Sequence, residues 1–196
     1  MTKNLTGLSS NLLAVISLVA ANTLPLFWLS QYNFFSLLFL YWLESGIVGF
    51  YNILKLRKIT GSFSSRPVIN FIKMWILALI IYIATIIMIV NAMANDIGPI
   101  AGRLILMTVP ALLISHGISY FYNFIGKKEF LLTTTKQQFK APLQRLLVLH
   151  FSIVVGGLLL LNYGLVQGAL IVFVVIKTFI DLGTHLNEHS KIRGAF

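Results

Sequence analysis

Residues 74–92 read MWILALIIYIATIIMIVNA, nineteen consecutive positions without a charged side chain. An α-helix of that length covers about 28 Å at ~1.5 Å per residue, close to the hydrocarbon thickness of a bilayer. A helix satisfies its own backbone hydrogen bonds, whereas an open strand in lipid would leave them unpaired. The stretch therefore predicts a helix that crosses a membrane.

Apolar segments of similar length lie on both sides of this one. Of the 196 residues, 58% are hydrophobic and 10% are charged, whereas about one quarter of a soluble domain is charged. The composition predicts an all-α polytopic transmembrane helix bundle that occupies residues 1–196 as a single domain. The first apolar run continues past Ala21 to Leu29, which favours a retained span over a cleaved signal peptide. The six predicted spans are approximately 8–30, 34–56, 70–92, 99–125, 143–161 and 165–187.

The connections between these spans alternate in charge. Stretches 55–73 and 126–145 are rich in Lys and Arg, whereas the links 30–33, 93–98 and 162–164 contain neither. Basic loops stay in the cytoplasm, so the pattern predicts a multi-pass protein of the cytoplasmic (inner) membrane, with both termini inside (N-in/C-in).

The net charge of +10 needs an explanation of its own. The basic residues sit in short loops between apolar runs. Setting the membrane topology and contacting anionic lipid head groups of the bilayer explain this charge better than binding to nucleic acid does. Homo-oligomerisation is left open. Cysteine is absent, which excludes disulfides and thiolate metal ligands.

Several ionisable side chains lie inside the predicted spans, where each costs about 2.5–3.5 kcal/mol to insert near the bilayer centre. Five of these side chains, from four different helices, form one layer about 16–25 Å from the outer ends of their spans, counted at ~1.5 Å per residue. They are Glu44, His116, His150, Lys177 and Asp181, with His185 about two turns of helix beyond Lys177 on the same face of the sixth span.

This layer predicts a divalent-metal site within the bundle. Imidazole and carboxylate groups are the ligands that Zn or Fe(II) takes, and a bundle core is a usual place for such a site. The function predicted on this basis is that of a membrane-embedded metal-dependent hydrolase, in which Glu44 is a ligand or a base and Lys177 an electrophile or charge partner. The predicted metal ligands are Glu44, His116, His150, Asp181 and His185.

Two alternatives remain open for the same residues. In a proton- or ion-coupled transporter, the His and carboxylate groups would form a relay, because they titrate within reach of neutral pH. In a structural or assembly protein, Lys177 would pair with Asp181 or Glu44 and neutralise the buried charges. His185 to His189 also match H-x-x-E-H, but that zinc signature needs an acidic ligand well downstream, and the sequence ends at Phe196.

At these residues the chain resembles an uncharacterised family of prokaryotic integral membrane proteins, classed as a domain of unknown function. The resemblance extends over most of the chain, and it implies a membrane location without a reaction, substrate or cofactor. It rests on Tyr41-Trp42-x-Glu44 followed by Gly49 and Asn52, on His116-Gly117, on Arg145-x-x-x-x-His150 with Gly156-Gly157, and on Lys177-x-x-x-Asp181-x-x-x-His185-x-x-Glu188-His189.

Overall fold

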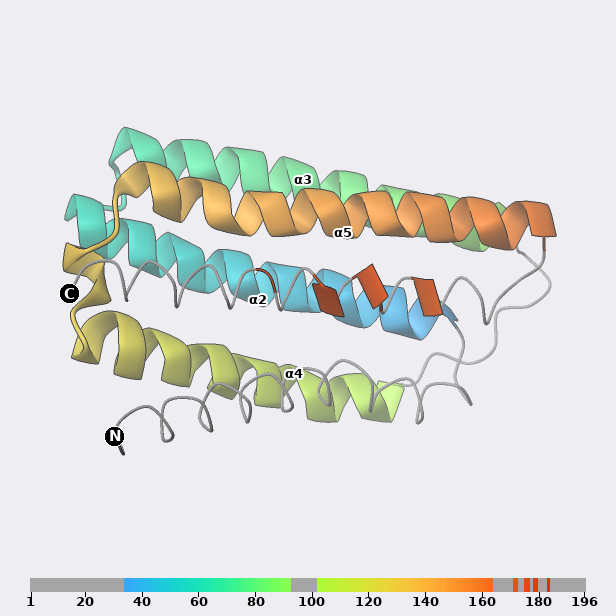
Figure 1. The fold of residues 1–196 in the computed structure, drawn as a ribbon, viewed down its shortest axis with the longest axis horizontal. Coiled ribbons are helices and arrows are strands. Elements are labelled where there is room, and N and C mark those ends of the chain that lie inside the picture. Colours follow the sequence, from blue (N-terminus) through green and yellow to red (C-terminus); the bar gives the residue numbers. More distant parts are fainter. Residues whose placement is uncertain are drawn as a thin grey trace, which may run out of the picture. The chain divides into compact units, whose positions relative to one another are not determined.

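The computed structural model describes residues 34–92 and 102–163, together with the short stretches 171–172, 175–176, 178–179 and 183. Within these residues the chain is helical and contains no strand, so the all-α prediction is confirmed. Figure 1 shows the helices in chain order. They are α2 (Phe34–Thr60), α3 (Arg66–Ala92), α4 (Gly102–Ile118), the π-helix η1 (Ser119–Gly126), the 3₁₀ turn η2 (Glu129–Leu131) and α5 (Thr135–Tyr163).

A short turn connects α2 to α3. Gly61 follows the last residue of α2 with a φ of 78° and donates its N–H to the carbonyl of Arg57 at 2.8 Å. Glycine adopts that left-handed conformation without steric cost, which is why it commonly ends helices. Pro67 lies in the first turn of α3, where a missing N–H breaks no helical hydrogen bond.

Helix α3 has one buried face and one exposed apolar face. Val68, Phe71, Trp75, Tyr82, Ile86 and Ile89 are buried and recur at helical spacing. The exposed face is also apolar, since Leu77 and Met88 are 58% and 65% exposed. An apolar surface of this extent is unusual for a protein in water and suits a helix surrounded by lipid.

Helix α5 begins with a capping box formed by Thr134 and Gln137. The Gln137 N–H donates to Oγ1 of Thr134 at 3.3 Å, and the Thr134 N–H donates to Oε1 of Gln137 at 3.0 Å. This reciprocal pair satisfies two backbone donors that a helix start otherwise leaves free. Pro142 lies inside the same helix.

Helix α2 is the central element of the compact unit formed by Asn33–His150. It packs against α3 on one side and α4 on another, and Figure 1 shows it between them. Residues at the start of α5 reach the same core, because Gln138 donates its side-chain N–H to Oδ1 of Asn52 on α2.

The helices match the predicted spans in part. Spans 34–56, 70–92 and 143–161 lie within α2, α3 and α5, all three of which are long and apolar enough to cross a membrane. Span 99–125 overlaps α4 and η1, so one predicted helix is observed as an α-helix continued by a π-helix. Span 8–30 and most of span 165–187 lie outside the described residues.

Candidate functional site

Tyr82 is the centre of a polar cluster inside the unit. Its side chain is fully buried on α3. The ring of His150 on α5 meets it edge-on, with 6.2 Å between the ring centroids and 77° between the planes. Glu44 and Tyr41 on α2 both interact electrostatically with Tyr82. Three helices thus bring a carboxylate, an imidazole and two phenols together.

The helical register explains why these residues meet. Tyr41 and Glu44 are three positions apart on α2 and therefore lie on neighbouring parts of one face. Tyr82 follows Trp75 by seven residues, two turns along the buried face of α3. His150 is half-buried on α5, between Leu149 and Ile153, which are buried.

The chemistry of the cluster favours proton exchange. Carboxylates and imidazoles are proton-exchanging groups, and a tyrosine hydroxyl both donates and accepts hydrogen bonds. Among the described side chains, the Tyr82 hydroxyl has no hydrogen-bond partner although it is buried. A hydroxyl in that position is available to accept or pass on a proton between its neighbours.

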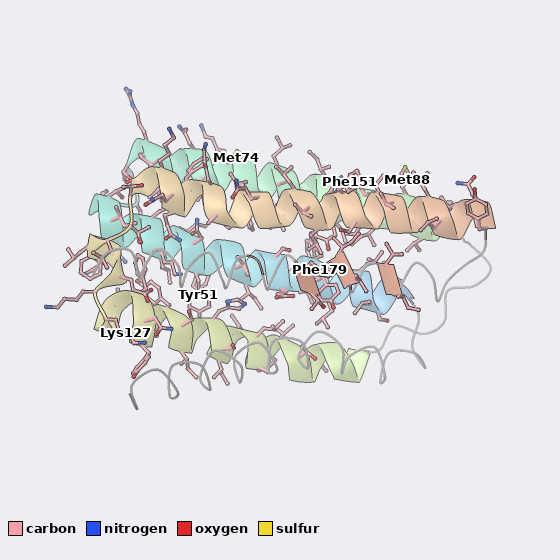
Figure 2. The ribbon with its side chains drawn as sticks, in the orientation of Figure 1. Tyr51, Met74, Met88, Lys127, Phe151 and Phe179 are labelled. Carbon is pink, nitrogen blue, oxygen red and sulfur yellow. The ribbon has the colours of Figure 1, made fainter. Side chains whose placement is uncertain are left out.

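His116 belongs to a different aromatic cluster, on the α4 side of α2. Its ring stacks on Tyr51 with the centroids 6.3 Å apart. The Tyr51 hydroxyl donates to the carbonyl of Leu113 at 2.9 Å, and Figure 2 shows Tyr51 between α2 and α4. Gly117 allows this approach, because a Cβ there would lie 2.9 Å from the Tyr51 hydroxyl.

The structure thus brings together some of the predicted metal ligands and not others. His150 contacts the Tyr82 ring and Glu44 influences Tyr82 electrostatically, whereas the ring contact of His116 is with Tyr51. Within the described ranges, no group of three His, Asp or Glu side chains is placed to hold a metal ion. Lys177, Asp181 and His185 lie outside these ranges, so the metal site stays a prediction.

A second buried polar group lies on the same face of α2, closer to its C-terminal end. Asn52 accepts the side-chain N–H of Gln138, and its own Nδ2 has no partner in the part of the chain that the structure describes. One turn earlier, Gly49 faces the indole of Trp75, and a Cβ on Gly49 would lie 1.9 Å from Nε1. Trp75 stacks on Phe71, with 5.2 Å between the centroids.

Basic and aromatic side chains pair at the end of the unit where α2 stops and α5 starts. Lys55 Nζ lies 5.2 Å from the ring centroid of Phe124, and Lys58 Nζ lies 4.9 Å from that of Phe130. These cation–π contacts connect α2 to η1 and η2. Lys127 is at this end in Figure 2. The turn at 61–65 and the connection at 127–134 therefore lie at one end, as the basic pattern predicts for loops on one side of a membrane.

Sequence reasoning missed the uncharged members of both polar groups. Tyr82 lies near the middle of the charge-free stretch 74–92, and a polar hydroxyl at that depth is a signal that indicates a buried polar site. Asn52 belongs to the family pattern but carries no charge that would mark it as a site residue, and Gln138 has no sequence signal of its own. The partners of an amide on a neighbouring helix cannot be read from spacing within one helix.

The fold and the cluster define a class: a helical protein with helices of membrane length and a polar group inside the bundle. A family model described as a family of unknown function (DUF6498) matches residues 4–195. The chain belongs to this family, which confirms the resemblance to a family of unknown function. No curated protein and no solved structure matches the chain.

Proposed function

We propose that this chain is a multi-pass protein of the cytoplasmic membrane that couples proton movement to transport, with Glu44, Tyr82 and His150 as its proton-carrying group. Six spans with both termini in the cytoplasm accommodate the hydropathy of the whole sequence. The basic end that carries Lys55, Lys58 and Lys127 then faces the cytoplasm and contacts anionic lipid head groups.

Two features support the membrane part of the proposal. Three described helices are long and apolar enough to cross a bilayer. The outer face of α3 is apolar, and Leu77, Ile80 and Met88 are each more than half exposed on it. Lipid would cover such a face, whereas water would leave it unstable.

The observation that carries the proton part is the convergence of Glu44 and His150 on one buried tyrosine. An ionisable side chain in a span is expensive and generally marks an ion or proton path. Here His150 on α5 contacts the Tyr82 ring on α3, and Glu44 on α2 influences the Tyr82 hydroxyl electrostatically. A site made only to hold the helices together would be better served by apolar side chains of similar volume.

The metal-dependent hydrolase remains a separate prediction. It needs at least three ligands at one point, and its predicted ligands are Glu44, His116, His150, Asp181 and His185. Metal analysis of purified protein separates the two functions, because a resident metal in stoichiometric amount that is lost in His150→Ala would favour the metal site.

Proton flux in proteoliposomes tests the proposal. The parent protein is reconstituted with a pH-sensitive dye inside the vesicles, and a potassium diffusion potential drives protons inward. Glu44→Gln keeps the size of the side chain and removes its titration. We expect the flux to fall about tenfold or more, a rate change that corresponds to ~1.4 kcal/mol of barrier. A parent protein without flux, or an unchanged flux in Glu44→Gln, would refute the proposal.

Matched controls separate the cluster from a general effect of charge. Glu129→Gln removes the carboxylate of η2, which lies at the basic end outside the cluster. His116→Gln removes the imidazole that stacks on Tyr51, and it is compared with His150→Gln. Both control variants should keep the flux of the parent, whereas His150→Gln should lose it.

A further inference from the structure

The buried face of α2 carries a continuous row of polar and small residues. Tyr41, Ser45, Gly49 and Asn52 follow each other at spacings of four, four and three, so they share one side of the helix. All four are buried. The row connects the level of Tyr82 with the level of Gln138, near the basic end.

At the end of this row, contacts close a ring across three helices. Asn52 on α2 bonds to Gln138 on α5, and Phe139 beside it meets Phe71 on α3 edge-on, with 5.5 Å between the centroids. Phe71 stacks on Trp75. The indole N–H edge of Trp75 faces Gly49, one turn from Asn52, which completes the ring.

Two hydrogen-bond donors of residues in this ring have no acceptor among the described groups. Asn52 Nδ2 and Trp75 Nε1 are buried and have no partner among the residues that the structure describes, and their side chains are 4% and 3% exposed. A buried N–H without an acceptor is strongly unfavourable, and more so within a membrane. In the same turn of α5, the Gln138 carbonyl cannot receive its usual helical bond from residue 142, because that residue is proline.

We propose that Asn52, Trp75 and Gln138 hold ordered water, and that this hydrated site is the step by which protons pass between the basic end and Glu44. Water accepts from the two free donors and donates to a free carbonyl, which no apolar ligand does. Uncharged donors alone do not compensate the desolvation of an anion, so water is the better occupant. The transfer role rests on the proposed function, whereas the hydration does not.

Trp42 and Trp75 lie at the same helix interface, so one molecule provides both the tested indole and its control. The indole N–H of Trp42 donates to the carbonyl of Leu79 at 2.9 Å, whereas that of Trp75 has no such acceptor among the described groups. The full chain is labelled with ¹⁵N at its three tryptophans and placed in lipid bilayers. Trp42→Phe and Trp75→Phe assign the two indole signals, and magnetisation transfer from water to each N–H is measured by solid-state NMR.

We expect transfer from water to Trp75 and little or none to Trp42. Asn52→Leu should reduce the transfer to Trp75, and added chloride should leave its resonance in place. Equal transfer to the two indoles, or a Trp75 resonance that moves with chloride concentration, would show that the site does not hold water as proposed.

The transfer role is tested by proton flux in the same vesicles. Trp75→Phe keeps a ring stacked on Phe71 and removes the N–H, and Asn52→Leu removes the amide. We expect each to lower the flux about tenfold, or ~1.4 kcal/mol of barrier. If Trp75 is hydrated but both variants keep the parental flux, the transfer role is refuted, while the proposed role of Glu44 is unaffected. Absence of flux in the parent would refute the proposed function, while the NMR result would still decide the hydration.

Discussion

Gly49 is the residue on which the packing of α2 against α3 depends most directly. The indole of Trp75 occupies the space where any other residue would place its Cβ, with Nε1 only 1.9 Å from that position. Neither ring nor backbone can move far, because Trp75 also stacks on Phe71 and is almost completely buried. A glycine here serves close approach of two helices, which is a frequent use of small residues in membranes.

A single methyl group tests this packing. Gly49→Ala should lower the stability by about 1–3 kcal/mol, the usual effect of overfilling a packed core, and thermal unfolding in detergent would report it as a lower midpoint. Gly46→Ala on the same helix is the matched control, since a Cβ there meets nothing within 4 Å. Equal midpoints for the two variants would contradict the close contact.

Only part of the candidate site could be predicted at this scale. Glu44 and His150 stand out in the sequence because a charge or an imidazole is rare in an apolar run. Their meeting point could not be predicted, because depth along a helix says nothing about which neighbour a side chain faces. His116 has a similar depth and faces Tyr51 instead. The pocket shared by all the ionisable residues therefore stays a prediction, and among the described residues Tyr82 is the side chain that relates to both Glu44 and His150.

The ends of the helices differ from the predicted spans for local reasons. Hydropathy places the apolar centre of a helix, but it does not record the polar turns that continue it. Helix α2 runs through Arg57 and Lys58 to Thr60, because long basic side chains are good helix formers and Gly61 provides the stop. Helix α5 begins about two turns before the predicted span, at the Thr134–Gln137 capping box, which the sequence pattern T-x-x-Q already contains.

The capping box should hold the first turn of α5 in place. Thr134→Ala removes the hydroxyl that accepts the Gln137 N–H, at a cost of about 1 kcal/mol. Hydrogen–deuterium exchange of amides in the first turn should then become about fivefold faster, with little change in the middle of α5. Thr135→Ala, the same change one residue later, should leave the exchange unaltered. Faster exchange in both variants would assign the effect to threonine content rather than to the cap.

On the scale of the whole molecule, the absence of cysteine makes the predicted orientation directly measurable. Ser62 and Lys128 are both exposed, one in the turn after α2 and one after η1. Ser62→Cys and Lys128→Cys should react with a membrane-impermeant maleimide only from the cytoplasmic side. Asn162→Cys, near the last residue of α5, should react only from the opposite side. Labelling of Ser62→Cys and Lys128→Cys from different sides would contradict the shared basic end.

The π-helix after α4 has a geometric consequence for that end. Such a segment has a wider turn than an α-helix and corresponds to one additional residue in the register. Removing that residue would leave an ordinary α-helix and would rotate the residues that follow by about 100° around the helix axis. Phe124 would then turn away from Lys55, and the link between the two loops would lose its contact. The angular position of Phe124 beside Lys55 thus depends on a single inserted position.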